Sequence, residues 1–78
     1  VYNARERYDE AIGKFKAALR LNPGYAEVHY NLGLAYDAQG KFREAIECYQ
    51  AFIRIAPPQY DPYVRQAEEN IRQLQQRM

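Results

Sequence analysis

The sequence predicts an all-α protein, and three observations lead to that fold class. Apolar residues recur every three or four positions in several stretches, as they do along one face of a helix. β-Branched residues are few, with three Val, five Ile and no Thr, which disfavours strands. Segments rich in glycine and proline separate the periodic stretches. With 78 residues, the chain is expected to form one domain.

The first predicted helix runs from Tyr8 to Leu21. Two acids in its first turn are favourable beside the positive end of the helix dipole. The segment 22–24, Asn-Pro-Gly, ends it, because proline cannot continue the hydrogen-bond ladder. Its apolar stripe consists of Ala11, Ile12, Phe15, Ala18 and Leu19.

Two helices with a tight turn between them come next, Ala26–Ala38 and Phe42–Ile55. Gly40 supplies the backbone freedom that the turn needs. Lys41 is a poor capping residue for the second of these helices, and Pro57-Pro58 ends it. The predicted buried residues are Val28, Leu32, Gly33, Ala35 and Tyr36 in the former helix and Ala45, Ile46, Tyr49, Phe52 and Ile53 in the latter.

A last helix is predicted to open at Asp61, an acidic cap followed by proline at the first helical position. Its remaining side chains are mostly Glu, Gln and Arg, so its outer side needs no neighbour. Such a helix can close a stack of repeated units. Its apolar positions are Val64, Ala67, Ile71, Leu74 and Met78.

An internal repeat underlies these elements. Shifting the sequence by 34 positions superimposes residues of the same kind at many sites, so the repeat is a property of the chain as a whole. The aligned pairs are Tyr2 and Tyr36, Tyr8 and Phe42, Glu10 and Glu44, Ala11 and Ala45, Ile12 and Ile46, Phe15 and Tyr49, Leu19 and Ile53, Leu21 and Ile55, and Pro23 and Pro57.

The spacing His29-x2-Leu32-Gly33-x2-Tyr36, then Ala45-x3-Tyr49, then Pro57, resembles the tetratricopeptide repeat, with His29 in place of the leading aromatic residue. The resemblance implies a solenoid of helix-turn-helix units. Residues 26–59 would form a complete repeat and residues 60–78 the C-terminal capping helix. Residues 1–25 would be a partial repeat, containing the tail of its first helix (Val1 to about Ala4) and its second helix. The chain would then be a fragment of a longer array.

The resemblance also assigns packing positions. In this family small residues occupy the closest contact between paired helices, and large residues fill the space around them. The positions that match are Leu32, Gly33, Tyr36, Ala45, Tyr49 and Pro57 in the complete repeat and Ala11, Phe15 and Pro23 in the partial one.

A protein-interaction scaffold is the function that the resemblance implies. The first helices of successive repeats would line a concave face, and this groove would bind a peptide carrying charges of both signs. The alternative is that these residues are merely solvated, with Glu68 and Arg72 forming an i,i+4 pair. The candidate groove residues are Glu27, Tyr30, Asn31, Leu34, Asp37 and Ala38 from the middle helix and Asp61, Arg65, Glu68 and Arg72 from the last.

Some members of the family grip the acidic C-terminal tails of chaperones through a basic clamp. Asn31 and Arg65 resemble two positions of that clamp. Asp61 stands where the clamp has a lysine, and its carboxylate would repel an acidic tail. A chaperone tail is therefore disfavoured as the ligand.

Catalysis and cofactor binding are not expected. The sequence has no Ser or Thr, and it shows no nucleophile–base pair, phosphate loop or metal-ligand spacing.

His29 is expected to pack between helices, since His29 and Cys48 are too few for a zinc site. Cys48 is expected to be partly exposed, with oxidation or an intermolecular bridge as the functional alternative. Most of the tyrosines are expected in the core.

Neither nucleic acid nor membrane is an expected partner. The formal net charge is +1 with acids and bases interleaved, and no apolar run approaches the roughly 20 residues of a membrane span. The single cysteine excludes an internal disulfide and is consistent with a reducing, cytoplasmic location.

Self-assembly is the second functional hypothesis. If the partner of the first complete helix is missing, Ile12, Phe15 and Leu19 would be partly exposed. Two chains would then cover each other's N-terminal edge as a homo-oligomer, or swap helices. The final helix offers a second route, because its spacing resembles a short coiled-coil seam.

Overall fold

Four α-helices and one short 3-10 turn make up the computed structural model, which describes residues 4–77, with side chains described from Arg7 onward. No strand occurs in that range, so the all-α prediction is confirmed. The elements are α1 (Ala4–Leu21), α2 (Ala26–Ala38), α3 (Phe42–Ile55), η1 (Pro58–Tyr60) and α4 (Asp61–Arg77).

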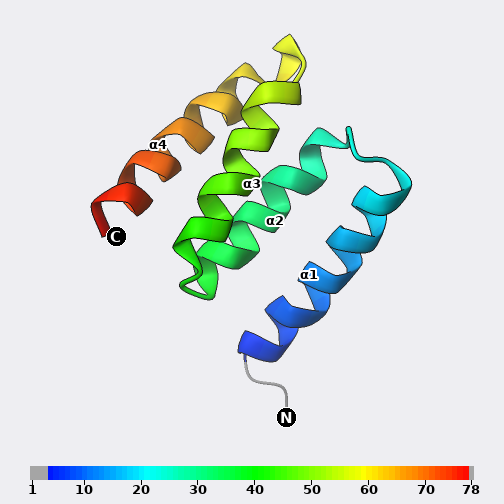
Figure 1. Cartoon of the computed structure of the whole chain (residues 1–78). Helices are drawn as coiled ribbons and strands as arrows, with labels where there is room; N and C mark the ends of the chain where they lie inside the picture. Colours follow the sequence, from blue (N-terminus) through cyan, green and yellow to red (C-terminus); the bar gives the residue numbers. More distant parts are fainter. Residues whose placement is uncertain (1–3, 78) are drawn as a thin grey trace.

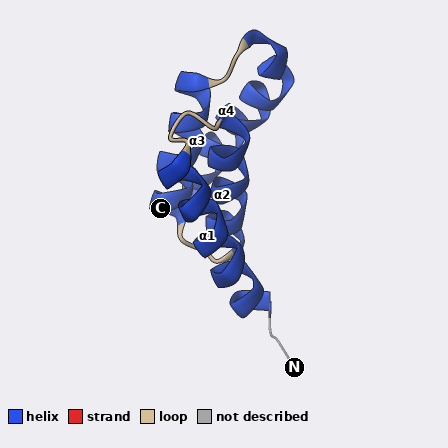
Figure 2. Ribbon diagram, turned by 90° about the vertical axis from the view of Figure 1, so that its right-hand side faces the viewer, coloured by secondary structure: helices blue, strands red, loops and turns tan. Residues whose placement is uncertain are grey.

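The helices stand side by side in chain order, each packed on the one before it (Figure 1). Seen from the edge, the stack is thin (Figure 2), and the whole measures 40 × 33 × 17 Å. A stack in which each helix contacts mainly its neighbours is the arrangement expected of a repeat protein.

The bounds of α2 and α3 are those predicted, but α1 begins at Ala4, ahead of the predicted Tyr8. The added residues are mostly Arg and Glu, which are good helix formers but carry no apolar periodicity. The prediction that Ala4 belongs to the tail of a preceding helix is wrong, because Ala4 is the first residue of α1. Positions 1–3 of that tail lie outside the described residues.

The turn between α2 and α3 depends on the backbone of Gly40. Its φ of 77° is left-handed, a region that residues with a Cβ rarely adopt. The Gly40 N–H donates to the Asp37 carbonyl (3.0 Å), and the Lys41 N–H donates to the Tyr36 carbonyl (2.9 Å). This is a Schellman motif, and it satisfies carbonyls at the end of α2. Lys41 then precedes α3 without a side-chain capping bond, as predicted.

The start of α4 differs from the prediction. Asp61 has helical angles (φ −49°, ψ −44°), and its N–H donates to the Pro58 carbonyl. It is therefore a residue of the helix and not the cap, because η1 runs directly into α4. The carboxylate still lies in the first turn, where the helix dipole favours it.

The core is densest where α3 packs between α2 and α4. Ala45 and Tyr49 are 0% exposed and Phe52 is 1% exposed. From α4, Ala67 and Leu74 complete this layer, whereas Val64 and Ile71 are half-buried and Met78 lies outside the described residues. All five predicted core positions of α2 are buried: Val28, Leu32, Gly33, Ala35 and Tyr36.

The corresponding positions of the partial repeat are less covered. Ala11, Phe15 and Ala18, which lie 34 positions before Ala45, Tyr49 and Phe52, are only half-buried. Leu19 is also half-buried, but the prediction that Ile12 would be partly exposed is wrong. Ile12 belongs to the buried core, on the side of α1 that packs toward the rest of the molecule.

The two prolines among the packing positions lie nearer the surface. Pro57 is half-buried, and Pro23 is exposed. Both follow the ends of helices, and α1 and α3 stop shortly before them. Their role in the repeat is therefore to end helices, because proline lacks the N–H that the next hydrogen bond would need.

Candidate functional site

A pocket of about 280 Å³ opens where α2, α3 and the η1–α4 segment meet. Three of the predicted groove residues, Glu27, Tyr30 and Asn31, line it from α2. Its other lining residues are Phe52, Tyr60 and Tyr63. Four of the six are aromatic, and Glu27 is the one that carries a formal charge.

Helical spacing and the proline-rich connection bring these side chains together. Residues 27, 30 and 31 of α2 are three or four positions apart and so share one side of the helix. Pro57 and Pro58 end α3, and the 3-10 turn that follows redirects the chain. This redirection places Tyr60 and Tyr63 beside Phe52, which is 1% exposed.

Tyr30 is the centre of the aromatic cluster. Its ring centroid lies 5.1 Å from that of Phe52, 5.9 Å from Tyr49 and 5.9 Å from Tyr63. Tyr60 is 6.2 Å from Phe52 and 6.0 Å from Tyr63. The planes are tilted or edge-to-face, the arrangements that the ring quadrupole favours. The cluster thus holds the pocket walls in place.

A hydrogen bond fixes the carboxylate of the pocket. The Tyr60 hydroxyl donates to Oε1 of Glu27, and this bond is the main reason that the pKa of Tyr60 is raised. The other oxygen, Oε2, has no partner among the side chains that the structure describes, residues 7–77. Burial, followed by the neighbouring Tyr63, raises the pKa of Tyr30. Both phenols are therefore neutral near pH 7 and act as aromatic walls and hydrogen-bond donors.

The rest of the predicted groove on α2 continues from the pocket toward the turn. Leu34 is 42% exposed, Ala38 is exposed and Asp37 is half-buried. Their spacing of three and four residues keeps them on the same side of α2 as Glu27 and Asn31. α2 therefore presents a continuous strip that contains acids and no Lys or Arg.

The predicted groove residues of α4 do not join this strip. Asp61, Arg65, Glu68 and Arg72 are exposed and do not line the pocket. At about 100° per residue, they lie roughly 140–200° round the helix from Tyr63. The prediction placed these residues by the 34-residue offset from α2. α4 has Gln66 and Asn70 where α2 buries Leu32 and Tyr36, so it packs through Ala67 and Leu74 instead.

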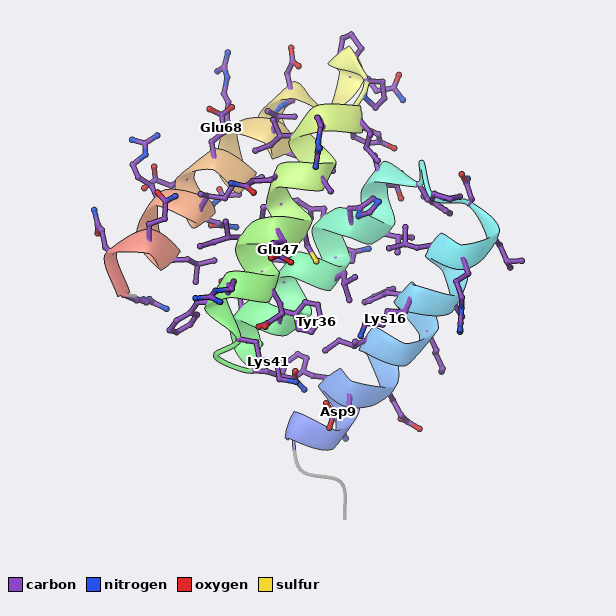
Figure 3. All side chains as sticks on the ribbon, in the orientation of Figure 1. Asp9, Lys16, Tyr36, Lys41, Glu47 and Glu68 are labelled. Atoms are coloured by element: carbon purple, nitrogen blue, oxygen red, sulfur yellow. The ribbon has the colours of Figure 1, made fainter. Side chains whose placement is uncertain are left out.

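The expected pairing on α4 also differs. Arg72 lies 3.9 Å from Glu69, one turn before it, and not against the predicted Glu68, which projects from α4 (Figure 3). The side chains of Arg72 and Glu69 are 69% and 50% exposed, so this pair contributes little to stability.

Phe52, Tyr60 and Tyr63 were not among the predicted site residues. Phe52 was assigned to the packing stripe of α3, and it does pack there while also forming a pocket wall. Tyr60 and Tyr63 flank the start of α4 at a spacing of three. The expectation that most tyrosines belong to the core holds for the buried Tyr36 and Tyr49, and Tyr8, Tyr30 and Tyr60 pack against the core while partly buried. It fails for Tyr25 and Tyr63, which are 45% and 54% exposed.

The geometry also bears on the clamp hypothesis. Asn31 lines the pocket, but Arg65 is exposed outside it, so the two do not form one anion site. The charged residue of the pocket is an acid, which repels a carboxylate.

On the α1 side of the stack, the Tyr36 ring lies between two lysines (Figure 3). Nζ of Lys16 is 5.8 Å and Nζ of Lys41 is 5.9 Å from the ring centroid. The neighbouring Tyr36 hydroxyl is the main reason that the pKa of Lys16 is raised. These cation–π contacts join α1 to the end of α2.

The cysteine and the histidine have structural surroundings. Cys48 is a half-buried free thiol, and burial, with the charge of Glu47, raises its pKa to about 11. A neutral thiol is a poor nucleophile, which disfavours the oxidation alternative. His29 Nε2 donates to the Pro23 carbonyl at 3.0 Å, linking α2 to the preceding turn.

The described part of the chain holds neither a metal-binding cluster nor a membrane-spanning helix. Among the side chains of residues 7–77, no group of three or more His, Cys, Asp or Glu is placed to hold a metal ion. No helix within residues 4–77 combines the length and the apolar character needed to cross a membrane.

Comparison with known proteins places these features in context. The sequence matches the family described as TPR repeat over residues 1–40 and the one described as tetratricopeptide repeat over residues 26–57. It is 33% identical over 54 residues to small glutamine-rich tetratricopeptide repeat-containing protein 2 of Saccharomyces cerevisiae, covering 69% of this chain. The protein of that name in Mycosarcoma maydis is 31% identical over 51 residues, covering 65% of this chain. The matches span 16% and 14% of these relatives.

Proposed function

The chain belongs to the tetratricopeptide repeat family, and on that premise we propose that it binds an extended segment of a partner protein in the pocket and along the exposed strip of α2. Membership of this family makes it a protein–protein interaction module. What the proposal adds is the surface on which the segment binds, and we call this surface the groove. It consists of the pocket residues together with Leu34, Asp37 and Ala38.

The observation that carries this proposal is the exposed apolar surface at the pocket and along the adjoining strip. Tyr63, in the pocket, is 54% exposed and Leu34, on the strip, is 42% exposed. Outside the groove, the large apolar side chains of the described chain are mostly covered, with Leu21, Tyr25 and Ile55 as the exposed ones. Concave sites lined by aromatic residues with a few fixed polar groups are the usual form of binding sites. The polar groups here are Asn31 and Glu27.

A pair of matched substitutions tests the groove. Segments that bind the immobilised chain are first selected from a random peptide library, and their affinities are measured by fluorescence anisotropy. Leu34→Glu places a charge in the groove and should weaken binding about tenfold or more. Leu21→Glu makes the same change at a residue that is 90% exposed at the end of α1, and affinity should stay within about twofold.

Two results count against the groove. If no segment can be selected, the chain does not bind a peptide in this way. If Leu34→Glu and Leu21→Glu have equal effects on affinity, the segment binds outside the groove. Circular dichroism melts of both variants separate loss of binding from loss of fold, because both substituted side chains are exposed and the melts should be preserved.

Self-assembly through α1 is a second candidate, supported by the incomplete burial of the partial repeat. Ala11, Phe15 and Ala18 are half-buried, whereas their equivalents in α3 are almost fully covered. A second copy could supply the missing cover. Light scattering over a wide concentration range decides this. A mass that stays at 9.2 kDa removes the candidate, and a dimer that Phe15→Lys returns to a monomer supports it.

A further inference from the structure

The pocket has the chemistry of a site for a cation. Four aromatic rings surround a space that contains one carboxylate and no basic side chain. The faces of aromatic rings attract a cation through their quadrupole, by about 0.5–2 kcal/mol per contact. Since a carboxylate and aromatic faces favour the same ligand charge, the lining is selective for positive groups.

The carboxylate is held ready for such a ligand. Glu27 is exposed, and Tyr60 fixes its Oε1 by a hydrogen bond. Oε2 has no partner among the described side chains, residues 7–77, so it can accept a hydrogen bond from a donor that enters the pocket. A fixed acceptor loses less conformational entropy on binding than a mobile one.

The charged residues around the pocket also favour a positively charged ligand. α2 contributes Glu27 and Asp37 to one side and has no Lys or Arg along its length. Arg65 and Arg72 lie on the far side of α4 from Tyr63, and Arg54 lies about 200° round α3 from Phe52. A basic segment laid along α2 would therefore meet the acids of that helix and none of its own cations, since α2 has no Lys or Arg.

The size of the pocket suits a single side chain, and its aromatic lining favours arginine over lysine. A volume of about 280 Å³ lies just below the usual range for ligand pockets, roughly 300 to 1,000 Å³. A guanidinium is planar, stacks on aromatic faces and donates several hydrogen bonds in a fixed fork. An ammonium is more strongly hydrated and gains less from stacked rings.

We propose that the pocket takes an arginine side chain from a basic segment of the partner protein. This inference rests on the proposed function, since it names the feature of the segment that the groove recognises. A neutral apolar side chain is the competing occupant, because Tyr63 and Phe52 would also contact it.

Three short acetylated peptide amides test the occupant, with the sequence Gly-Ala-X-Ala-Gly and X as arginine, citrulline or norleucine. Citrulline has the shape of arginine without its charge. Each is titrated into isotopically labelled protein at about 50 mM salt, where screening is weak. The arginine peptide should shift the amides of Glu27, Tyr30, Asn31, Tyr60 and Tyr63, and bind about tenfold more tightly than the other two.

Matched variants tie the effect to the carboxylate. Glu27→Gln should bring the arginine and citrulline peptides to within about threefold of each other. Glu68→Gln removes an exposed acid on the other side of α4 and should preserve the tenfold difference. Equal binding of norleucine and arginine, or arginine shifts scattered outside the pocket, would overturn the proposal.

The same selected segments separate this proposal from the one on which it rests. If segments bind and Leu34→Glu weakens them, but replacing each of their arginines by citrulline changes affinity less than about twofold, the groove stands and the arginine pocket is wrong. If no segment binds through the groove, both proposals fail.

Discussion

The backbone of Gly33 lies directly against the ring of Tyr49. A Cβ atom added to Gly33 would lie 2.7 Å from Cε1 and 2.8 Å from Cδ1 of that ring. Real Cβ atoms do not approach other carbons so closely, and Tyr49 is 0% exposed in a filled core. The close contact between α2 and α3 therefore requires a residue without a side chain at position 33.

Gly33→Ala should therefore destabilise the protein, although alanine is the better helix former. We expect a loss of about 1–3 kcal/mol in the free energy of unfolding, measured by urea titration, because the added methyl overpacks the α2–α3 contact. Gly13→Ala is the control, since nothing lies within 4 Å of its added Cβ. That variant should gain about 1 kcal/mol. Equal effects of the two substitutions would contradict the contact.

Gly40→Ala tests the turn between the paired helices. An alanine at a φ of 77° is strained, and the Schellman hydrogen bonds depend on that angle. We expect a loss of about 1 kcal/mol or more. Gly24→Ala is the comparison, since its added Cβ would make only an ordinary contact, 3.8 Å from Asn22 Oδ1. If Gly40→Ala melts at the wild-type temperature, the turn does not need its left-handed residue.

Tyr49 separates the contribution of a ring from that of a hydroxyl. The hydroxyl is buried and makes no hydrogen bond of normal geometry within residues 4–77, although Asn70 lies near it. Burial, followed by the charge of Asp37, raises its pKa. Tyr49→Phe should change the unfolding free energy by less than about 1 kcal/mol, while Tyr49→Ala should cost about 3–5 kcal/mol. A large cost for Tyr49→Phe would show that the hydroxyl has a partner.

The raised pKa of Cys48 predicts that the stability of the folded protein depends on pH. Its native pKa is raised from 9.0 to about 11, so between these values the thiol stays neutral in the folded protein and ionises when unfolded. The stability from this difference is complete below pH 9 and is lost as the pH rises toward about 11. Alkylation by iodoacetamide should have its midpoint near pH 11 in the native protein and near 9 in urea. A native midpoint below pH 9 would contradict the burial.

The helices were largely predictable because their ends are marked by strong local signals. Gly40 sets the turn after α2, and Pro57-Pro58 stop α3, so both helices have the predicted bounds. The start of α1 carried no such signal, since its first turn is polar and lacks periodicity. The cap at Asp61 was misplaced because a single 3-10 turn leaves no periodic trace.

The site was predictable only in part, for a geometric reason. The repeat offset placed Glu27, Tyr30 and Asn31 together, since they lie on one helix. It failed on α4, where the apolar residues that set the rotation of α2 are replaced by Gln66 and Asn70. The rotation of a helix about its own axis depends on its packing partners. No single-sequence pattern could therefore show that Tyr63 turns toward Tyr30.

The most direct test of the account is an amide shift map of the isotopically labelled chain with a selected partner segment bound. The account predicts that the largest shifts fall on Glu27, Asn31 and Leu34 of α2 and on Tyr60 and Tyr63. Shifts centred instead on exposed residues of α3, such as Arg43, Glu47 and Gln50, would contradict it, because those side chains do not line the groove.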